Sequence, residues 1–210
     1  MKTILAGAAF LLSLSSCEIK VGNKVNKEQT AQEDIQQTLD FPLESDFSKE
    51  YLLENFWKCT YDSAGEPLAY WVVLPKNVKP KNIKPVTIKA LGLTSIGDYG
   101  TIDENDYMEV QITYETLTAA QQPATWLKGK LSLMHDKILN QNLIRTKEGE
   151  EYVDVLTSRT MKDGNHIISR LNVLKSGLNF FMIRVSCDEK VYQKLAPTIF
   201  HTSTTWGLKS

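Results

Sequence analysis

The chain has 210 residues, of which 42% are hydrophobic and 23% are charged, and its formal net charge at pH 7 is -1. This composition is typical of a globular protein with a packed core, and the length suits one domain with a tether. The near-neutral charge gives no general attraction to nucleic acid or to an anionic membrane, so we expect no nucleic-acid partner.

The first sixteen residues have the three parts of a bacterial export signal. Lys2 provides the positive start, residues 4–14 form an apolar core, and Ser15 and Ser16 are small residues at a cleavage site. The apolar core is too short for a transmembrane helix, which needs about 20 apolar residues. Residues 1–16 are therefore predicted to be a signal peptide that is removed.

The end of this segment, Leu14-Ser15-Ser16-Cys17, resembles the lipobox of bacterial lipoproteins. The resemblance implies cleavage before Cys17, a diacylglycerol on its thiol and an acyl chain, such as palmitate, on its freed amine. Several acyl chains anchor a protein to a membrane durably, whereas one holds it only weakly. Glu18 is not the aspartate that retains enteric lipoproteins in the inner membrane, which favours the outer membrane, with the domain facing the periplasm. The alternative is an ordinary secretory signal with a chance cysteine.

Residues 17–40 are predicted to be the lipid anchor and a flexible tether, because they are polar and have few aromatic residues. A short helix over residues 31–39 is compatible with this segment. The folded domain is expected over residues 41–210.

Two cysteines besides Cys17 occur in the chain, Cys59 and Cys187. In an oxidising periplasm such a pair suggests a disulfide, which would close a long loop and stabilise the fold by roughly 4–5 kcal/mol. Two buried free thiols are the alternative, since cysteine packs well as a small apolar residue. No histidine stands in a recognisable partner motif, which disfavours a catalytic thiol.

The first half of the domain is predicted to be mainly β-structure. Residues 56–61 and 68–74 are expected to pair as a hairpin around the turn at residues 63–67. Further strands are expected over residues 86–91 and 108–114, the latter because apolar and polar residues alternate cleanly.

Between these strands, residues 76–85 contain two prolines and are predicted to form a loop. Four lysines in it are candidates for contact with an acidic partner or lipid phosphates: Lys76, Lys79, Lys81 and Lys84. The plainer interpretation is a solvated loop that these lysines keep soluble.

An amphipathic helix is predicted from Pro123, with Leu127, Leu131, Met134 and Ile138 on its apolar face. Strands over residues 143–147, 152–160, 167–174 and 180–187 should follow, the middle two joined at the Asp163-Gly164 turn. A last helix begins at residues 188–189, with a kink or break at Pro197. This order predicts an α+β fold, an antiparallel β-sheet covered by helices.

The Pro-x-x-Trp-Leu helix at residues 123–127, the paired strands around Asp163-Gly164 and the segment Tyr192-Gln193-Lys194-Leu195-Ala196-Pro197 together resemble PsbP-like domains. The resemblance implies an α/β/α sandwich over roughly residues 47–208. PsbP-like proteins share no active site and act mostly by protein contact, as scaffolds, assembly factors or adaptors, so this implication for function is an analogy.

The sequence contains no strong motif for catalysis or metal binding. His135-Asp136 could pair a base with an acid, but neighbouring helix residues point in different directions. The acidic run at residues 103–106 lacks the glycine and distal glutamate of a calcium loop. We therefore expect no enzyme activity, no catalytic residue, no metal site and no cofactor.

The sequence thus predicts an envelope lipoprotein, held to the membrane through the lipid on Cys17, that binds other envelope proteins as a scaffold or assembly factor. Such a protein could belong to a secretion or envelope machine. A periplasmic carrier of a small apolar or lipid ligand is the alternative, and a hydrolase is the third class considered.

Overall fold

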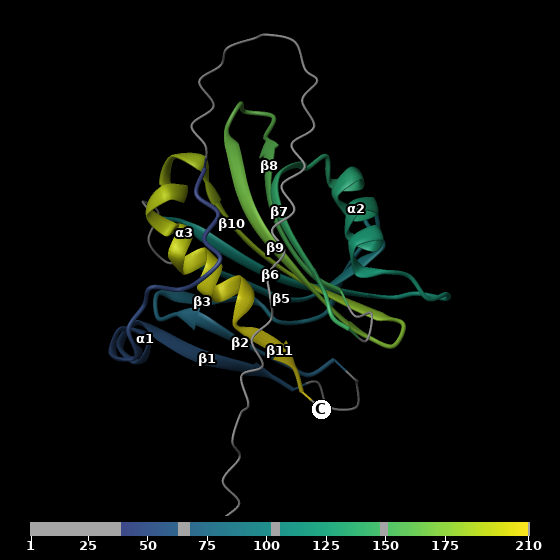
Figure 1. The fold of residues 1–210 in the computed structure, drawn as a ribbon, viewed down its shortest axis with the longest axis horizontal. Helices are drawn as coiled ribbons and strands as arrows, with labels where there is room; N and C mark the ends of the chain where they lie inside the picture. The colour runs from purple at the N-terminus through teal and green to yellow at the C-terminus, as the bar shows by residue number, and fades with distance from the viewer. Residues whose placement is uncertain (1–38, 63–67, 102–105, 148–150, 210) are drawn as a thin grey trace, which may run out of the picture. The chain divides into compact units, whose positions relative to one another are not determined.

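An antiparallel sheet of eight strands lies at the centre of the fold (Figure 1). The structure is a computed structural model that describes residues 39–62, 68–101, 106–147 and 151–209. The strand order is β3-β5-β6-β10-β9-β8-β7, with β4 paired to β5. Their bounds are β3 (Val78–Asn82), β4 (Val86–Ile88), β5 (Leu93–Thr101), β6 (Met108–Thr116), β7 (Lys137–Arg145), β8 (Glu151–Thr160), β9 (His166–Ser176) and β10 (Asn179–Asp188).

A smaller sheet and helices complete the fold. The small sheet has the order β1-β2-β11, with bounds β1 (Phe56–Tyr61), β2 (Tyr70–Pro75) and β11 (Trp206–Leu208). The helices in the described residues are α1 (Lys49–Asn55), α2 (Pro123–Met134) and α3 (Glu189–Thr204). The predicted α+β fold with an antiparallel sheet and helices is confirmed.

The two faces of the large sheet have separate cores, because side chains alternate between the faces of a strand. On β10, Val185 belongs to the core that also contains β2 and α3 residues such as Val72 and Ile199. On the opposite face of the same strand, Met182 belongs to a second core with Leu127 of α2. The sheet is therefore packed between α3 with the small sheet on one face and α2 on the other.

The predicted first hairpin is confirmed, since β1 and β2 pair from Phe56 opposite Pro75 to Tyr61 opposite Tyr70. Its turn, residues 63–67, lies outside the described residues. On the other side of β2, Trp206 of β11 pairs with Val72. Strand β11 was not predicted, because it is only three residues long and follows a Ser/Thr-rich stretch.

The prediction that residues 76–85 form a loop is wrong, because Val78–Asn82 is strand β3. The side chain of Val78 is fully buried in the core, and β3 pairs with β5. Pro80 is compatible with this strand because β3 is at the edge of the sheet, where a missing N–H breaks no ladder bond. Residues 86–88, part of the expected strand at 86–91, form β4.

Helix α2 begins at Pro123 as predicted but ends four residues before Ile138. His135 adopts a left-handed conformation with φ of 56°, and its backbone N–H donates to Ser132 O. The chain then turns and enters β7 at Lys137, so Ile138 is a strand residue and the strand expected at 143–147 begins earlier. The i+4 spacing of Ile138 matched the helix only by coincidence.

The second half of the domain follows the prediction closely. The β8–β9 and β9–β10 pairs are antiparallel, and Gly164 and Gly177 have the positive φ that their turns require. Cys187 of β10 is buried in the core. Asp188 caps α3 by accepting from the N–H of Lys190. The break considered at Pro197 is wrong, because α3 continues through this residue as one helix.

Helix α1 and strand β5 were missed by the sequence analysis. Helix α1 has only seven residues and begins after its cap, Ser48. None of its side chains is buried, so no apolar periodicity marks it in the sequence. β5 contains Gly97 and Gly100, which read as turn residues. Gly97 is required there because a Cβ would overlap the Tyr70 hydroxyl.

The helices within the described part of the chain include none that is both long and apolar enough to cross a membrane. The predicted signal peptide, lipidated Cys17 and helix at 31–39 lie outside the described residues, apart from Leu39. Leu39 and Phe41 already pack against the core, and the Tyr192 hydroxyl donates to the backbone oxygen of Asp40.

Candidate functional site

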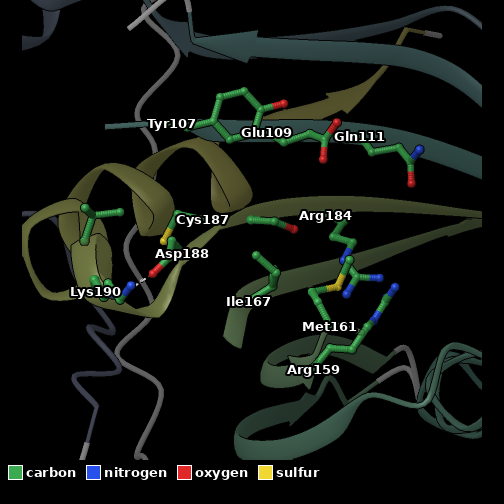
Figure 2. Close-up of a pocket in the computed structure, with 12 residues that line it drawn as sticks. Tyr107, Glu109, Gln111, Arg159, Met161, Ile167, Arg184, Cys187, Asp188 and Lys190 are labelled. Carbon is green, nitrogen blue, oxygen red and sulfur yellow. Dashed lines mark hydrogen bonds between the residues drawn. The ribbon is translucent and has the colours of Figure 1, made fainter. Parts of the chain in front are cut away.

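A groove of about 650 Å³ lies at one end of the large sheet and is here called the charged groove. Figure 2 shows Tyr107, Glu109 and Gln111 of the β6 region along one side, with Arg159 and Arg184 across from them. The start of α3 closes one end. The full lining is Tyr107, Glu109, Gln111, Arg159, Met161, Ile167, Arg184, Ser186, Cys187, Asp188, Lys190 and Val191.

The groove exists because α2 covers only part of its face of the sheet. Phe180 and Met182 on β10 lie in the α2 core, whereas Arg184 and Ser186 follow on the same face beyond the helix. The strand thus changes from apolar to polar where the covering helix stops. Arg184 is nevertheless buried at this position, and Ser186 is half-buried.

Asp136 anchors the two arginines of the groove. Its fully buried carboxylate accepts from Arg159 Nε at 2.6 Å and from Arg184 Nη2 at 2.7 Å. Arg184 Nε also donates to Ser169 Oγ at 3.1 Å. Burial lowers the pKa of the Arg184 guanidinium, and the charge of Asp136 opposes that effect. The pair is therefore fixed in position, with Arg159, whose side chain is 31% exposed, turned toward solvent.

The end of α2 places Asp136 in this position. The left-handed His135 turns the chain, and the N–H of Asp136 donates to Leu131 O, which directs the carboxylate under the strands. Because both oxygens of Asp136 accept from arginines, this acid is engaged with arginine and does not serve His135 as an orienting acid.

The opposite side of the groove carries negative and aromatic groups. Lys81 donates to the Tyr107 hydroxyl and lies 3.6 Å from Glu109 Oε1. The bond to Tyr107, followed by the charge of Glu109, raises the pKa of the Lys81 ammonium although burial opposes it. The groove therefore presents anionic and cationic side chains on facing walls.

The four candidate lysines do not form one surface. Lys81 borders the charged groove, whereas the ammonium of Lys79 lies 5.7 Å from the ring centre of Trp57 in the small sheet. Lys76 and Lys84 are exposed in the turns before and after β3. Because residues 78–82 form a strand, Lys79 and Lys81 lie against different groups and do not form one cluster with Lys76 and Lys84.

Cys59 and Cys187 are both free thiols, so the disulfide considered from the sequence is not formed in this structure. Cys59 is half-buried, with its sulfur 3.6 Å from the Tyr99 hydroxyl, and Cys187 is buried in the core. Burial raises the pKa of the Cys187 thiol to about 12. A thiol so protonated is a poor nucleophile, which fits a packing role.

Tyr70 and Tyr99 join the two sheets and are structural. Their hydroxyls are 2.7 Å apart, and Tyr70 also donates to Ile96 O. Burial raises the pKa of both phenols, so both stay neutral. Their positions in the core separate them from the charged groove.

Metal-binding groups are not assembled in the described residues, where no three histidine, cysteine or acidic side chains lie together as ligands. Of the acidic run, Asp106 pairs with Lys194 of α3, and residues 103–105 lie outside the described part of the chain.

Arg159 and Arg184 were not predicted as site residues, and Asp136 was considered only as a partner of His135. One signal was present: Arg184 interrupts the apolar segment 180–187, and a charge inside an apolar strand is rarely buried without a partner. Its partner could not be identified, because Asp136 is 48 residues away along the chain.

No family model and no curated protein matches this sequence. Among solved structures, the chain is similar to the cyanobacterial PsbP (CyanoP) of Synechocystis, with 11% identity and a TM-score of 0.49 over 74% of this chain and 93% of that one. It is also similar to LpqN, involved in cell envelope biogenesis of Mycobacterium tuberculosis, with 14% identity and a TM-score of 0.46 over 77% and 96%. A Bacteroides thetaiotaomicron protein has 10% identity and a TM-score of 0.38 over 67% and 45%. This level of similarity assigns neither family nor function.

Proposed function

We propose that the chain is a non-enzymatic envelope lipoprotein, anchored through lipid on Cys17, whose domain binds other envelope proteins as a scaffold or assembly factor. The lipobox-like Leu14-Ser15-Ser16-Cys17 supports the anchor, and Glu18 supports the outer membrane. The observation that carries the binding role is the charged groove, where Arg159 and Glu109 lie on opposite walls.

A polypeptide suits this groove better than an apolar molecule does. Its walls offer fixed charges of both signs, and charge pairing across an interface selects the partner and sets its register. An apolar ligand would have to remove water from Arg159, Glu109 and Lys190 without giving them hydrogen bonds, which is unfavourable.

The alternative, a carrier of an apolar or lipid ligand, finds no space beneath α3. The side chains of Tyr99, Phe181 and Tyr192 fill that interface and are at most 1% exposed. Ligand mass released on denaturation of the purified protein would support the carrier instead.

The binding role is tested by crosslinking in intact cells and affinity purification of the tagged chain. A double variant, Arg159→Glu with Lys190→Glu, reverses two charges of the groove, and we expect about tenfold lower recovery of the partners. Lys162→Glu in the exposed β8–β9 turn is the matched control. Equal recovery from the double variant and the control would refute the groove as the binding site.

The anchor is tested separately with Cys17→Ala. We expect this variant to lose labelling by radioactive palmitate and to leave the membrane fraction, because the acylated thiol is gone. Retention of both label and membrane association would mean that Cys17 is not the lipidated residue.

A further inference from the structure

Strand β7 has an unpaired outer edge in the described part of the chain. It is the last strand of the large sheet and pairs only with β8. The backbone N–H of Gln141 donates to the side-chain oxygen of Asn140 at 2.8 Å, which indicates that it faces away from β8. Because backbone groups alternate along an antiparallel ladder, the N–H of Leu143 also faces outward.

An apolar groove of about 630 Å³ runs between this strand and α2. Leu127 and Leu131 of α2 line one side, and Leu143 of β7 lines the other. Leu143 is 47% exposed and Ile138, in the same groove, is 40% exposed. An open strand edge beside exposed apolar side chains is the arrangement to which an additional strand can pair.

Two lysines lie at this groove or beside it. Lys128 of α2 lines it, and Lys137 begins β7. The nearby acid, Glu151, already pairs with Arg145, so that pair adds no net charge. The two lysines leave an excess of positive charge, which favours an occupant with acidic residues.

We propose that β7 binds an extended segment of a partner protein as an additional strand, with apolar side chains at alternate positions and acidic residues at its ends. The backbone of the segment pairs with the outward groups of Leu143 and, by displacing the side chain of Asn140, with those of Gln141. Its apolar side chains cover the α2–β7 groove. This inference rests on the proposed protein-binding function but uses a surface other than the charged groove.

A second copy of this chain is a poorer occupant. The bulge between Ile138 and Asn140 interrupts the alternation of faces along β7. A two-fold pairing centred on Gln141 would also place Lys137 opposite Arg145 of the other copy, and like charges directly opposite are destabilising.

The test measures peptide binding to the full mature chain by fluorescence anisotropy. The probes are peptides of about ten residues with valine at alternate positions, carrying either aspartate and glutamate or lysine at the ends. We expect the acidic peptide to bind about tenfold more tightly than the basic one, with the difference reduced by added salt.

Variants of β7 locate the binding edge. Leu143→Pro removes an outward N–H that makes no bond to β8, and proline is tolerated at such an edge, so the fold should persist while binding weakens about tenfold. Leu143→Glu keeps the N–H but should repel the acidic peptide. It tests the same position if the proline variant does not fold. Lys128→Glu should weaken binding as well, with Lys162→Glu as its control and Leu178→Ala as the control for an exposed leucine elsewhere.

The proposal is overturned if neither peptide binds, if both bind equally, or if all β7 variants bind like the unchanged chain. Self-association abolished by Leu143→Glu would instead assign the edge to a second copy. Failure of this inference can be told apart from failure of the proposed function. The charged-groove double variant should leave peptide binding unchanged, and a lack of partners in cells would not alter the peptide result.

Discussion

At the scale of single residues, Asp136 is the side chain on which the charged groove depends. It is buried between two arginines, and Arg184 is itself only 11% exposed. A buried charge without its partner is strongly destabilising, whereas an exposed ion pair contributes little. The stability of this end of the sheet therefore depends on one carboxylate.

We predict that Asp136→Asn lowers the free energy of unfolding by about 3–5 kcal/mol, because it leaves the Arg184 guanidinium buried without a counter-charge. Urea denaturation measures the change. The matched control is Asp62→Asn, which breaks the exposed pair of Asp62 with Lys209 and should lower the free energy by under about 1 kcal/mol. Equal losses in both variants would contradict the buried-charge argument.

His201 should make the stability depend on pH. It packs edge-on against Phe56, with ring centres 4.9 Å apart, and burial lowers its pKa below the ordinary value of 6.5. The unfolded chain therefore binds more protons below that pH, and the free energy of unfolding falls as pH decreases through about 6.5. Melting temperatures from about pH 7.5 to 5 should show a smaller slope for His201→Leu, and an unchanged slope would exclude His201 as its source.

At the scale of elements, two glycines differ in whether the neighbouring element leaves space for a Cβ. Gly129 lies within α2 with open space around its Cα, whereas Gly97 lies against Tyr70 in β5. Both look alike in the sequence. Only the packing of the neighbouring element determines which of them can be replaced.

We predict that Gly129→Ala raises the free energy of unfolding by about 0.5–1 kcal/mol, because alanine loses less backbone entropy in a helix. Gly97→Ala should lower it by about 1–3 kcal/mol, since its Cβ would overlap the Tyr70 hydroxyl. Thermal denaturation of both variants checks the opposite signs. Changes of the same sign would contradict this packing.

The two edge strands of the large sheet carry features that limit pairing with other chains. β3 carries Pro80 and exposed lysines, and β7 carries a bulge with Lys137 and Arg145 at its ends. These features oppose uncontrolled pairing of sheet edges. They leave the centre of β7, around Gln141 and Leu143, as the part of that edge to which a specific strand can bind.

At the scale of the whole domain, the two sheets are held together by a shared core and not by a covalent link. Cys59 is in the small sheet and Cys187 in the large one, and both are free. The hydroxyl contact between Tyr70 and Tyr99 and the surrounding apolar side chains connect the sheets instead.

We therefore predict that a reducing agent leaves the free energy of unfolding unchanged. A disulfide between Cys59 and Cys187 would make the reduced protein less stable by roughly 4–5 kcal/mol. In the folded protein Cys187 should resist alkylation, because it is buried and its pKa is about 12, and it should react after unfolding. Mass spectrometry of the alkylated chain decides between these states.

Much of the fold was predictable because its signals are local. Alternation at Met108, Val110 and Ile112 indicates a strand, and Asp163-Gly164 indicates a hairpin turn. The end of α2 was not predictable, because the apolar period continues to Ile138 and the left-handed residue at the helix end is His135, where glycine is usual. The charged groove was not predictable either, because its residues come from β6, β8, β9, β10 and α3, which are far apart in the chain.

The sequence by itself determined the α+β class and the β8–β9–β10 meander, because strand alternation and turn chemistry act between residues close in the chain. Only the tertiary structure decided that Lys79 and Lys81 belong to a strand, that the two thiols stay apart, and that Asp136 joins Arg159 to Arg184. These outcomes depend on contacts between distant segments, for which one sequence carries no local signal.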